Sequence, residues 1–179
     1  MSQAFAAAKS MFNSTDELRY GKDKALSGMV GGQVREQTVL TPDWLLDAIR
    51  AVAPIGLDPC TTTDNPVEAW RWFTEEQNGL SEAWDHGLTY TNPPYGDLKP
   101  WMQKCWAEAR FGVRIYLLAP FRPHRRWFNE YTKGHTVVTL APFPFKGHKA
   151  SFPAPLALVC FNLPVPNLGK YETGRWVQL

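Results

Sequence analysis

Apolar positions in the first hydrophobic part of the chain follow a helical spacing. Between residues 44 and 52 the large apolar side chains recur three or four positions apart, which predicts a helix that ends before Pro54. Thr41 is of a type that caps helices, and Pro42 suits the first helical position because proline has no N–H to leave unbonded. The pattern therefore predicts a capped helix beginning at Thr41-Pro42.

Shorter apolar or aromatic runs, separated by turn residues, predict six strands at residues 55–57, 70–74, 88–91, 113–118, 136–140 and 156–161. Two further helices are expected at about residues 98–110 and 125–132. Strands that alternate with helices indicate an α/β fold with a mainly parallel sheet. The last two strands have no long helix between them, so we expect them to pair as an antiparallel C-terminal hairpin.

The motif Asn92-Pro93-Pro94-Tyr95, directly after the third predicted strand, is the strongest candidate for an active site. Two consecutive prolines exclude a continued strand or an immediate helix, so the chain turns at a strand end, where open α/β sheets bind ligands. The Asn92 amide oxygen and a prolyl carbonyl could each accept a hydrogen from an exocyclic amine, while Tyr95 stacks on its ring. The plainer alternative is a tight loop made of common turn residues.

Polar residues also follow the first two predicted strands. Asp58 ends the first strand, and Glu75 and Asn78 come just after the second. Because the carboxyl ends of neighbouring parallel strands lie side by side, a carboxylate there could bind a cationic amine or a ribose hydroxyl. The alternatives are a cap for Asp58 and a solvated turn for the other two residues.

Composition narrows the class of protein. The chain has 179 residues, 44% of them hydrophobic, which is enough for one domain with a full core, and we place it at residues 37–179. Residues 1–36 have few large apolar side chains and several glycines, so we expect a flexible N-terminal arm. Cys60, Cys105 and Cys160 form no CxxC pair, so neither disulfides nor a metal site is indicated and a reducing cytoplasm fits best. No apolar run is long enough to suggest a membrane span.

Basic residues gather in the loops after two of the later strands. The net charge is only +2, so a nucleic-acid partner has to be argued from where the charge lies. The candidates, interleaved with aromatic residues, are Arg122, His124, Arg125, Arg126, Lys146 and Lys149. Basic loops beside a base pocket would neutralise phosphates, whereas the alternative is a solvated face over an aromatic core.

The order and spacing of these motifs resemble a known family. Thr41-Pro42, Leu57 to Cys60, Phe73 to Glu75, Gly79-Leu80, Trp84, Asn92 to Gly96, Trp101 and Arg122 to Phe128 are together similar to the phage-type DNA N6-adenine methyltransferases, which are related to Dam. The resemblance spans about residues 38–162. It implies a Rossmann-like fold using S-adenosylmethionine, site-specific methylation of adenine in double-stranded DNA, and a cytoplasmic location, that of the bacterial host if the chain is phage-encoded.

The resemblance also implies roles for single residues. Against the cofactor it places Thr41, Pro42, Asp58 and Pro59 at the methionine part, Glu75 at the ribose, Asn78 at the adenine, and Asn92 between cofactor and target. The catalytic set would be Asn92, Pro93, Pro94 and Tyr95, with Asn92 and Pro93 accepting from the target amine and Tyr95 stacking on the base. The adenine is expected to leave the duplex, because its amine is otherwise unreachable.

Two features depart from the family's pattern. The glycine-rich cofactor turn is replaced by Thr61 to Pro66, and Asn78 stands where the family usually has Asp. RNA bases and protein glutamine amides remain alternative methyl acceptors, because the motif suits any planar amine. A nucleic-acid-binding module that has lost its cofactor is a further alternative, and both a monomer and a homodimer are compatible with the sequence.

Overall fold

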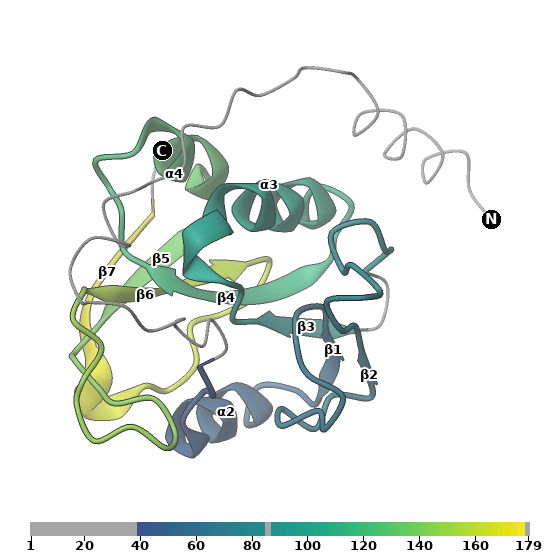
Figure 1. Ribbon diagram of the computed structural model, residues 1–179. Coiled ribbons are helices and arrows are strands. Elements are labelled where there is room, and N and C mark those ends of the chain that lie inside the picture. The colour runs from purple at the N-terminus through teal and green to yellow at the C-terminus, as the bar shows by residue number, and fades with distance from the viewer. Residues whose placement is uncertain (1–38, 85–86, 178–179) are drawn as a thin grey trace. The chain divides into compact units, whose positions relative to one another are not determined.

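Residues 39–84 and 87–177 are described by the computed structural model, and they form a mixed sheet with helices on both faces (Figure 1). The sheet has seven strands in the order β2-β1-β3-β4-β6-β5-β7. Their bounds are β1 Ile55–Asp58, β2 Arg71–Trp72, β3 Leu88–Thr91, β4 Arg114–Pro120, β5 Thr136–Leu140, β6 Leu156–Phe161 and β7 Glu172–Val177. The predicted arm at residues 1–36 lies outside the described residues, so the division into arm and domain stays a prediction.

Two kinds of pairing divide the sheet. Strands β2, β1, β3 and β4 pair in parallel, whereas β4 with β6, β6 with β5, and β5 with β7 are antiparallel. The predicted α/β fold and the hairpin of β5 and β6 are confirmed. A mainly parallel sheet is only partly matched, because no helix crosses over between β5 and β6, so β6 returns antiparallel and inserts beside β4.

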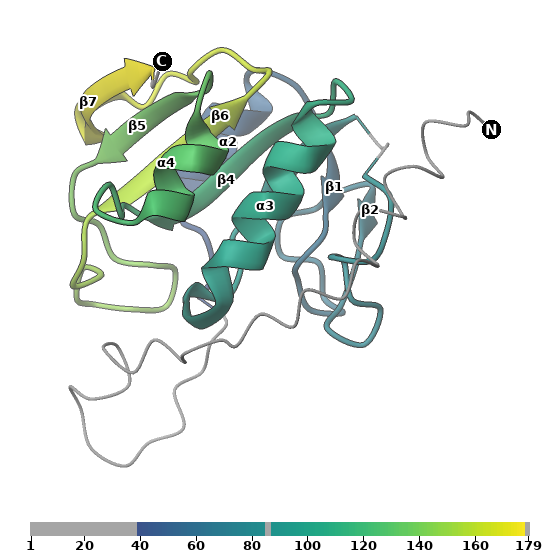
Figure 2. The same ribbon diagram turned by 90° about the horizontal axis from the view of Figure 1, so that it is seen from above.

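Among the described residues, three α-helices cover the sheet: α2 Asp43–Arg50 on one face, and α3 Leu98–Ala109 and α4 Arg126–Thr132 on the other (Figures 1 and 2). Successive residues of β4 point alternately into the two cores, Tyr116 and Leu118 toward α2 and Ile115 and Leu117 toward α3. Because both faces of β4 are buried, its sequence is a nearly continuous run of apolar residues. No helix among the described residues is long and apolar enough to cross a membrane.

The start of α2 differs from the prediction. The helix begins at Asp43 with Pro42 as its N-cap residue, and no side chain caps it. The Thr41 hydroxyl instead forms a buried hydrogen bond of 2.7 Å with the Tyr90 hydroxyl of β3. The predicted Thr41 cap is therefore wrong, because a partner from the neighbouring strand takes the hydroxyl.

The two edges of the sheet also differ from the prediction. The expected strand at residues 70–74 is reduced to Arg71 and Trp72, because Thr74 turns away and its N–H donates to the Gln77 side chain at 3.0 Å. On the opposite edge, β7 was not predicted. Its side chains are only half-buried or exposed, and Gly174 interrupts the strand pattern, so the sequence gives a weak signal. The glycine is needed because a larger side chain there would press on Thr139 of β5.

Candidate active site

Three segments that are distant in sequence meet at the carboxyl ends of β1 and β3. They are residues 39–42 before α2, Asp58 at the end of β1, and the turn from Asn92 to Tyr95 after β3. The Asn92 side chain bonds to the first segment, and Tyr90 of β3 lies near Asp58, because burial raises the pKa of its hydroxyl and the Asp58 carboxylate adds to the rise. The structure thus brings the predicted catalytic turn beside the residues expected to border a cofactor.

The Asn92 amide is oriented by its own chain. Its nitrogen donates to the Val39 carbonyl at 2.8 Å and to the Thr41 hydroxyl at 3.4 Å. Its oxygen accepts from the Tyr95 hydroxyl at 2.8 Å. An amide oxygen has two lone pairs, so one is left after the bond from Tyr95. The site therefore presents an acceptor, rather than a donor, to a group that binds beside Asn92.

Tyr95 is half-buried in an aromatic wall supplied by the loop between β5 and β6. Its ring meets Phe152 at 5.3 Å and 79°, and Phe145 at 6.4 Å. The Tyr95 carbonyl accepts a hydrogen bond of 3.4 Å from the buried Arg122 guanidinium. Burial raises the pKa of the Tyr95 hydroxyl, which therefore stays protonated and able to donate to Asn92. The turn is consequently fixed both through its side chains and through its backbone.

Asp58 is a buried acid at the end of β1, with 3% of its surface exposed. Its Oδ1 accepts from the Cys60 N–H at 3.1 Å, and the Thr61 side chain also bonds to it. Burial raises the pKa of the carboxyl to about 7, against the smaller opposing effect of these two hydrogen bonds. No cation among the described residues forms an ion pair with it. A cationic group of a ligand would supply the missing partner, which is the chemistry expected of a cofactor amine.

Asp58→Asn is expected to make the protein more stable above pH 7. A carboxyl whose pKa is about 7 when folded and 3.8 when unfolded holds its proton more tightly in the folded state. The free energy of unfolding of the wild type should therefore fall as the pH rises from about 4 to about 7, by up to about 1.4 kcal/mol per pH unit. The neutral amide lacks this titration, so denaturant unfolding between pH 4 and 8 should give a flatter profile. If the wild type and Asp58→Asn showed the same dependence of unfolding free energy on pH, Asp58 would not be a buried acid without an ion-pair partner.

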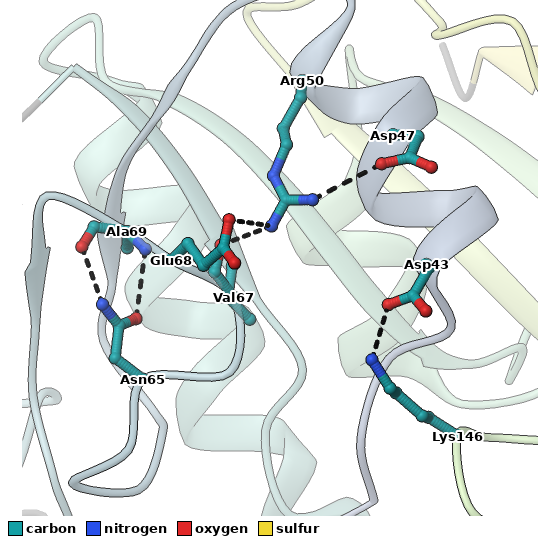
Figure 3. Close-up of polar contacts among 8 residues, drawn as sticks. All are labelled: Asp43, Asp47, Arg50, Asn65, Val67, Glu68, Ala69 and Lys146. Atoms are coloured by element: carbon teal, nitrogen blue, oxygen red, sulfur yellow. Dashed lines mark hydrogen bonds and ion pairs between the residues drawn. The ribbon is translucent and has the colours of Figure 1, made fainter.

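The loop after β1 lacks the glycine-rich turn that is typical of the family, and an asparagine supplies its left-handed conformation instead. Asn65 has a φ of 46°, a left-handed conformation that asparagine tolerates better than most residues. Figure 3 shows its side chain closing the loop by accepting from the Ala69 N–H at 3.1 Å and donating to the Ala69 carbonyl at 2.9 Å. Arg50 of α2 holds the same loop by donating to the Val67 carbonyl at 2.9 Å. The loop is therefore built without glycine.

Gly79 packs directly against the Asp58-Pro59 turn. A Cβ atom built on Gly79 would lie 2.9 Å from the Pro59 carbonyl carbon and still closer to its oxygen. The Gly79 carbonyl also accepts from the indole N–H of Trp84 at 2.8 Å. This close approach places the exposed Asn78, whose φ is 52°, beside the end of β1. Burial raises the pKa of Cys60, and Asp58 and Glu75 add to the rise, so Glu75 also lies near this turn. The contacts of Glu75 and Asn78 with a ribose and an adenine stay predictions.

The predicted DNA-binding residues fall into three groups. His124, Arg126 and Lys149 are exposed. Arg122 is buried and holds the Tyr95 carbonyl, and Arg125 is half-buried beside it. Lys146 is exposed but forms an ion pair of 2.8 Å with Asp43 of α2 (Figure 3). Its backbone N–H also donates to the Leu40 carbonyl at 2.9 Å, which fastens the β5–β6 loop to the segment before α2. Contact with DNA stays a prediction for all of these residues.

Sequence reasoning missed Tyr90, Phe145 and Phe152 as parts of the site. The signal for Tyr90 was its place in the strand, because residues two apart share a face and Tyr90 therefore lies on the side of Asn92. The two phenylalanines come from a proline-rich loop without periodicity, so only their position in the fold shows that they meet Tyr95.

The cysteines play no evident chemical part in this site. Cys60, Cys105 and Cys160 are unpaired, and burial raises the pKa of the Cys60 thiol to about 12, with Asp58 and Glu75 adding to the rise. A protonated thiol is a weak nucleophile. Within the described part of the chain, no group of three or more His, Cys, Asp or Glu side chains is placed to hold a metal.

Comparison with known proteins gives the class and then the family. A mixed α/β sheet with polar side chains at the ends of its parallel strands is consistent with a methyltransferase fold. The family model for DNA N-6-adenine-methyltransferase (Dam) matches residues 33–141, which is more than half of the chain. The chain therefore belongs to the Dam family of DNA N-6-adenine-methyltransferases. No curated protein matches it.

Proposed function

We propose that this protein transfers a methyl group from S-adenosylmethionine to the N6 amine of an adenine turned out of double-stranded DNA. The observation that carries the proposal is the orientation of Asn92, whose amide hydrogens are bonded to the segment before α2 and whose oxygen retains a lone pair. An acceptor fixed in this way suits an exocyclic amine. Membership of the Dam family supports adenine in DNA as the target.

The residues around Asp58 fit S-adenosylmethionine. A buried carboxyl with neutral hydrogen-bond partners and no cation among the described residues suits the cofactor's amino group. When bound, the cofactor would supply a methyl group on a positively charged sulfur, which would leave as a neutral thioether when the N–C bond forms, and the methylated amine would then lose its extra proton to water. Asn78 and Glu75 lie around the turn that Gly79 presses against Pro59, where an adenine and a ribose can be held.

The protein's own contribution is to position the amine. Asn92 accepts one amine hydrogen through its second lone pair, and the Pro93 carbonyl accepts the other, which leaves the nitrogen lone pair directed away from both. Tyr95 supplies the ring against which the base stacks, worth roughly 1–3 kcal/mol. Holding two reactants in line can account for about 7–11 kcal/mol of a barrier, so positioning can supply a large part of the catalysis.

Basic residues that are exposed should carry the DNA affinity. Arg126→Ala and Lys149→Ala are each expected to weaken DNA binding and to reduce the slope of log affinity against log salt by about 0.9, because one phosphate contact is lost. Lys146→Ala should change the slope less, since Asp43 already pairs with that ammonium at 2.8 Å. Fluorescence-anisotropy titrations at several salt concentrations measure all three slopes. Equal slopes in all variants and the wild type would argue against phosphate contacts here.

The direct test is incubation of the full chain with methyl-labelled S-adenosylmethionine and unmethylated duplex DNA, followed by digestion to nucleosides. Labelled N6-methyldeoxyadenosine is the expected product. Label in RNA or in protein glutamine, tested in parallel reactions, would replace DNA as the acceptor. Equilibrium dialysis with the labelled cofactor completes the test, because a cofactor-less binding module would bind DNA and retain no label.

A further inference from the structure

Behind the Asn92 amide lies a buried chain of hydrogen bonds. The Tyr90 and Thr41 hydroxyls are 2.7 Å apart, and the Thr41 hydroxyl also accepts from the Asn92 amide nitrogen at 3.4 Å. Tyr90 has no exposed surface and Thr41 only 6%. Burial also raises the pKa of Tyr90, so its hydroxyl keeps its proton. Little water can reach this chain to replace its members.

The Val39 carbonyl and the Thr41 hydroxyl together hold the amide in one of its two orientations. A hydroxyl has one hydrogen and two lone pairs, so Thr41 can bond to Tyr90 in either direction and still offer a lone pair to Asn92. With the amide turned over, its oxygen would face the Val39 carbonyl, which can only accept, and its nitrogen would face Tyr95. Two acceptors would then oppose each other, and the acceptor needed for an amine would be turned away. The Thr41 hydroxyl supports the observed orientation by accepting the second amide hydrogen.

We propose that Thr41 and Tyr90 are positioning residues, which fix the Asn92 amide with its oxygen toward the target amine. This role rests on the proposed methyl transfer. It differs from the cofactor contact that the sequence resemblance implies for Thr41, because the Thr41 hydroxyl is already engaged by two protein groups. It also gives Tyr90 a function that the sequence motif does not assign.

Thr41→Val tests the proposal, because valine has the shape of threonine without its hydroxyl. We expect kcat to fall about tenfold, as the loss of one buried hydrogen bond allows, while the Kd for S-adenosylmethionine changes less than about twofold. Thr41→Ser restores the hydroxyl and should recover most of kcat. A raised cofactor Kd with kcat intact at saturating cofactor would overturn the proposal in favour of a cofactor contact, and an unchanged kcat would overturn it outright.

Thr89→Val is the matched control. Thr89 lies in the same strand as Tyr90, is fully buried, and its hydroxyl has no hydrogen-bond partner among the described residues. The same chemical change there removes no bond, so kcat should stay within about twofold of the wild type and stability should rise slightly. A tenfold loss in Thr89→Val as well would mean that valine in this region acts through packing, which would overturn the assignment to Thr41.

A double-variant cycle adds Tyr90. Tyr90→Phe should lower kcat by less than Thr41→Val, since Thr41 keeps its bond to Asn92. The double variant should be no slower than Thr41→Val alone, because Tyr90 acts only through the Thr41 hydroxyl. Fully additive losses in kcat would contradict a single chain of hydrogen bonds from Tyr90 through Thr41 to Asn92.

One readout does not depend on activity. In a protein of 20.3 kDa, the side-chain amide hydrogens of Asn92 can be followed by nuclear magnetic resonance. They should exchange slowly with solvent in the wild type and about tenfold faster or more in Thr41→Val, as one of their two acceptors is lost. Slow exchange without any methyl transfer would leave the positioning intact and refute the proposed function. Fast exchange in the wild type would refute the positioning itself.

Discussion

Asn92→Ala is expected to abolish methyl transfer while leaving S-adenosylmethionine binding nearly unchanged. The substitution removes the side-chain oxygen that we propose accepts from the target amine, and it also removes the acceptor of the Tyr95 hydroxyl, which donates to that oxygen at 2.8 Å. Loss of a single preorganised hydrogen-bonding group costs about 10²–10³-fold in rate in well-studied enzymes, and the loosened Tyr95 should add to this. Single-turnover transfer of labelled methyl and equilibrium dialysis with the cofactor measure the two quantities separately.

Asn162→Ala is the matched control for this change. Asn162 likewise donates through its amide nitrogen to two acceptors, here the carbonyls of Ala109 at 2.7 Å and Val113 at 3.0 Å, and it directly follows β6. Its replacement should lower the melting temperature without lowering the turnover of the folded protein. If Asn92→Ala loses cofactor binding as well, or if both variants lose transfer equally, general destabilisation would explain the result.

Gly79→Ala is expected to have the largest effect on stability and to weaken cofactor binding with it. The added methyl group would lie 2.9 Å from the Pro59 carbonyl carbon, and both neighbours are backbone that cannot rotate aside. Overpacking of this kind costs about 3 kcal/mol, which corresponds to a fall of roughly 10 °C in melting temperature for a domain of this size. Separation of the two turns would also move Asn78 away from Asp58. Calorimetry with and without S-adenosylmethionine measures both effects.

Gly96→Ala separates this steric effect from the general cost of replacing glycine. Gly96 follows the turn from Asn92 to Tyr95, and a Cβ atom there meets nothing within 4 Å. Its melting temperature should stay within about 2 °C of the wild type, because a surface substitution without strain changes stability little. A Gly79→Ala protein as stable as Gly96→Ala would contradict the close packing of the two turns.

The sequence predicted the elements well wherever local signals agree with the fold. The helix at α3, the strands β1, β3, β4, β5 and β6, and the hairpin of the last two follow from periodicity and turn residues alone. The edges were less predictable. β2 keeps two residues of an aromatic run, and β7 is interrupted by Gly174, so neither edge strand has a local pattern that matches its final length.

The sequence predicted which segments form the candidate site, but not the hydrogen bonds and ion pairs that join them. The motif at Asn92 and the acid at Asp58 were recognisable from their places after strands. The partners of Asn92 were not, because Val39 and Thr41 are about fifty positions away and only the sheet brings them together. The same holds for Arg122 and Lys146, which sequence alone assigned to phosphates and which the fold joins to the Tyr95 carbonyl and to Asp43.

The place of β6 in the sheet has a consequence for how the protein is made. β6 lies between β4 and β5 and pairs with both, yet it follows β5 in the chain. During synthesis β5 therefore emerges without a partner, and the apolar β4 keeps an open edge until residues 156–161 leave the ribosome. Such an edge can pair with another chain, so this interval is the one in which a chaperone would protect the nascent protein. The stretch shared with the family ends at residue 141, before that edge is closed.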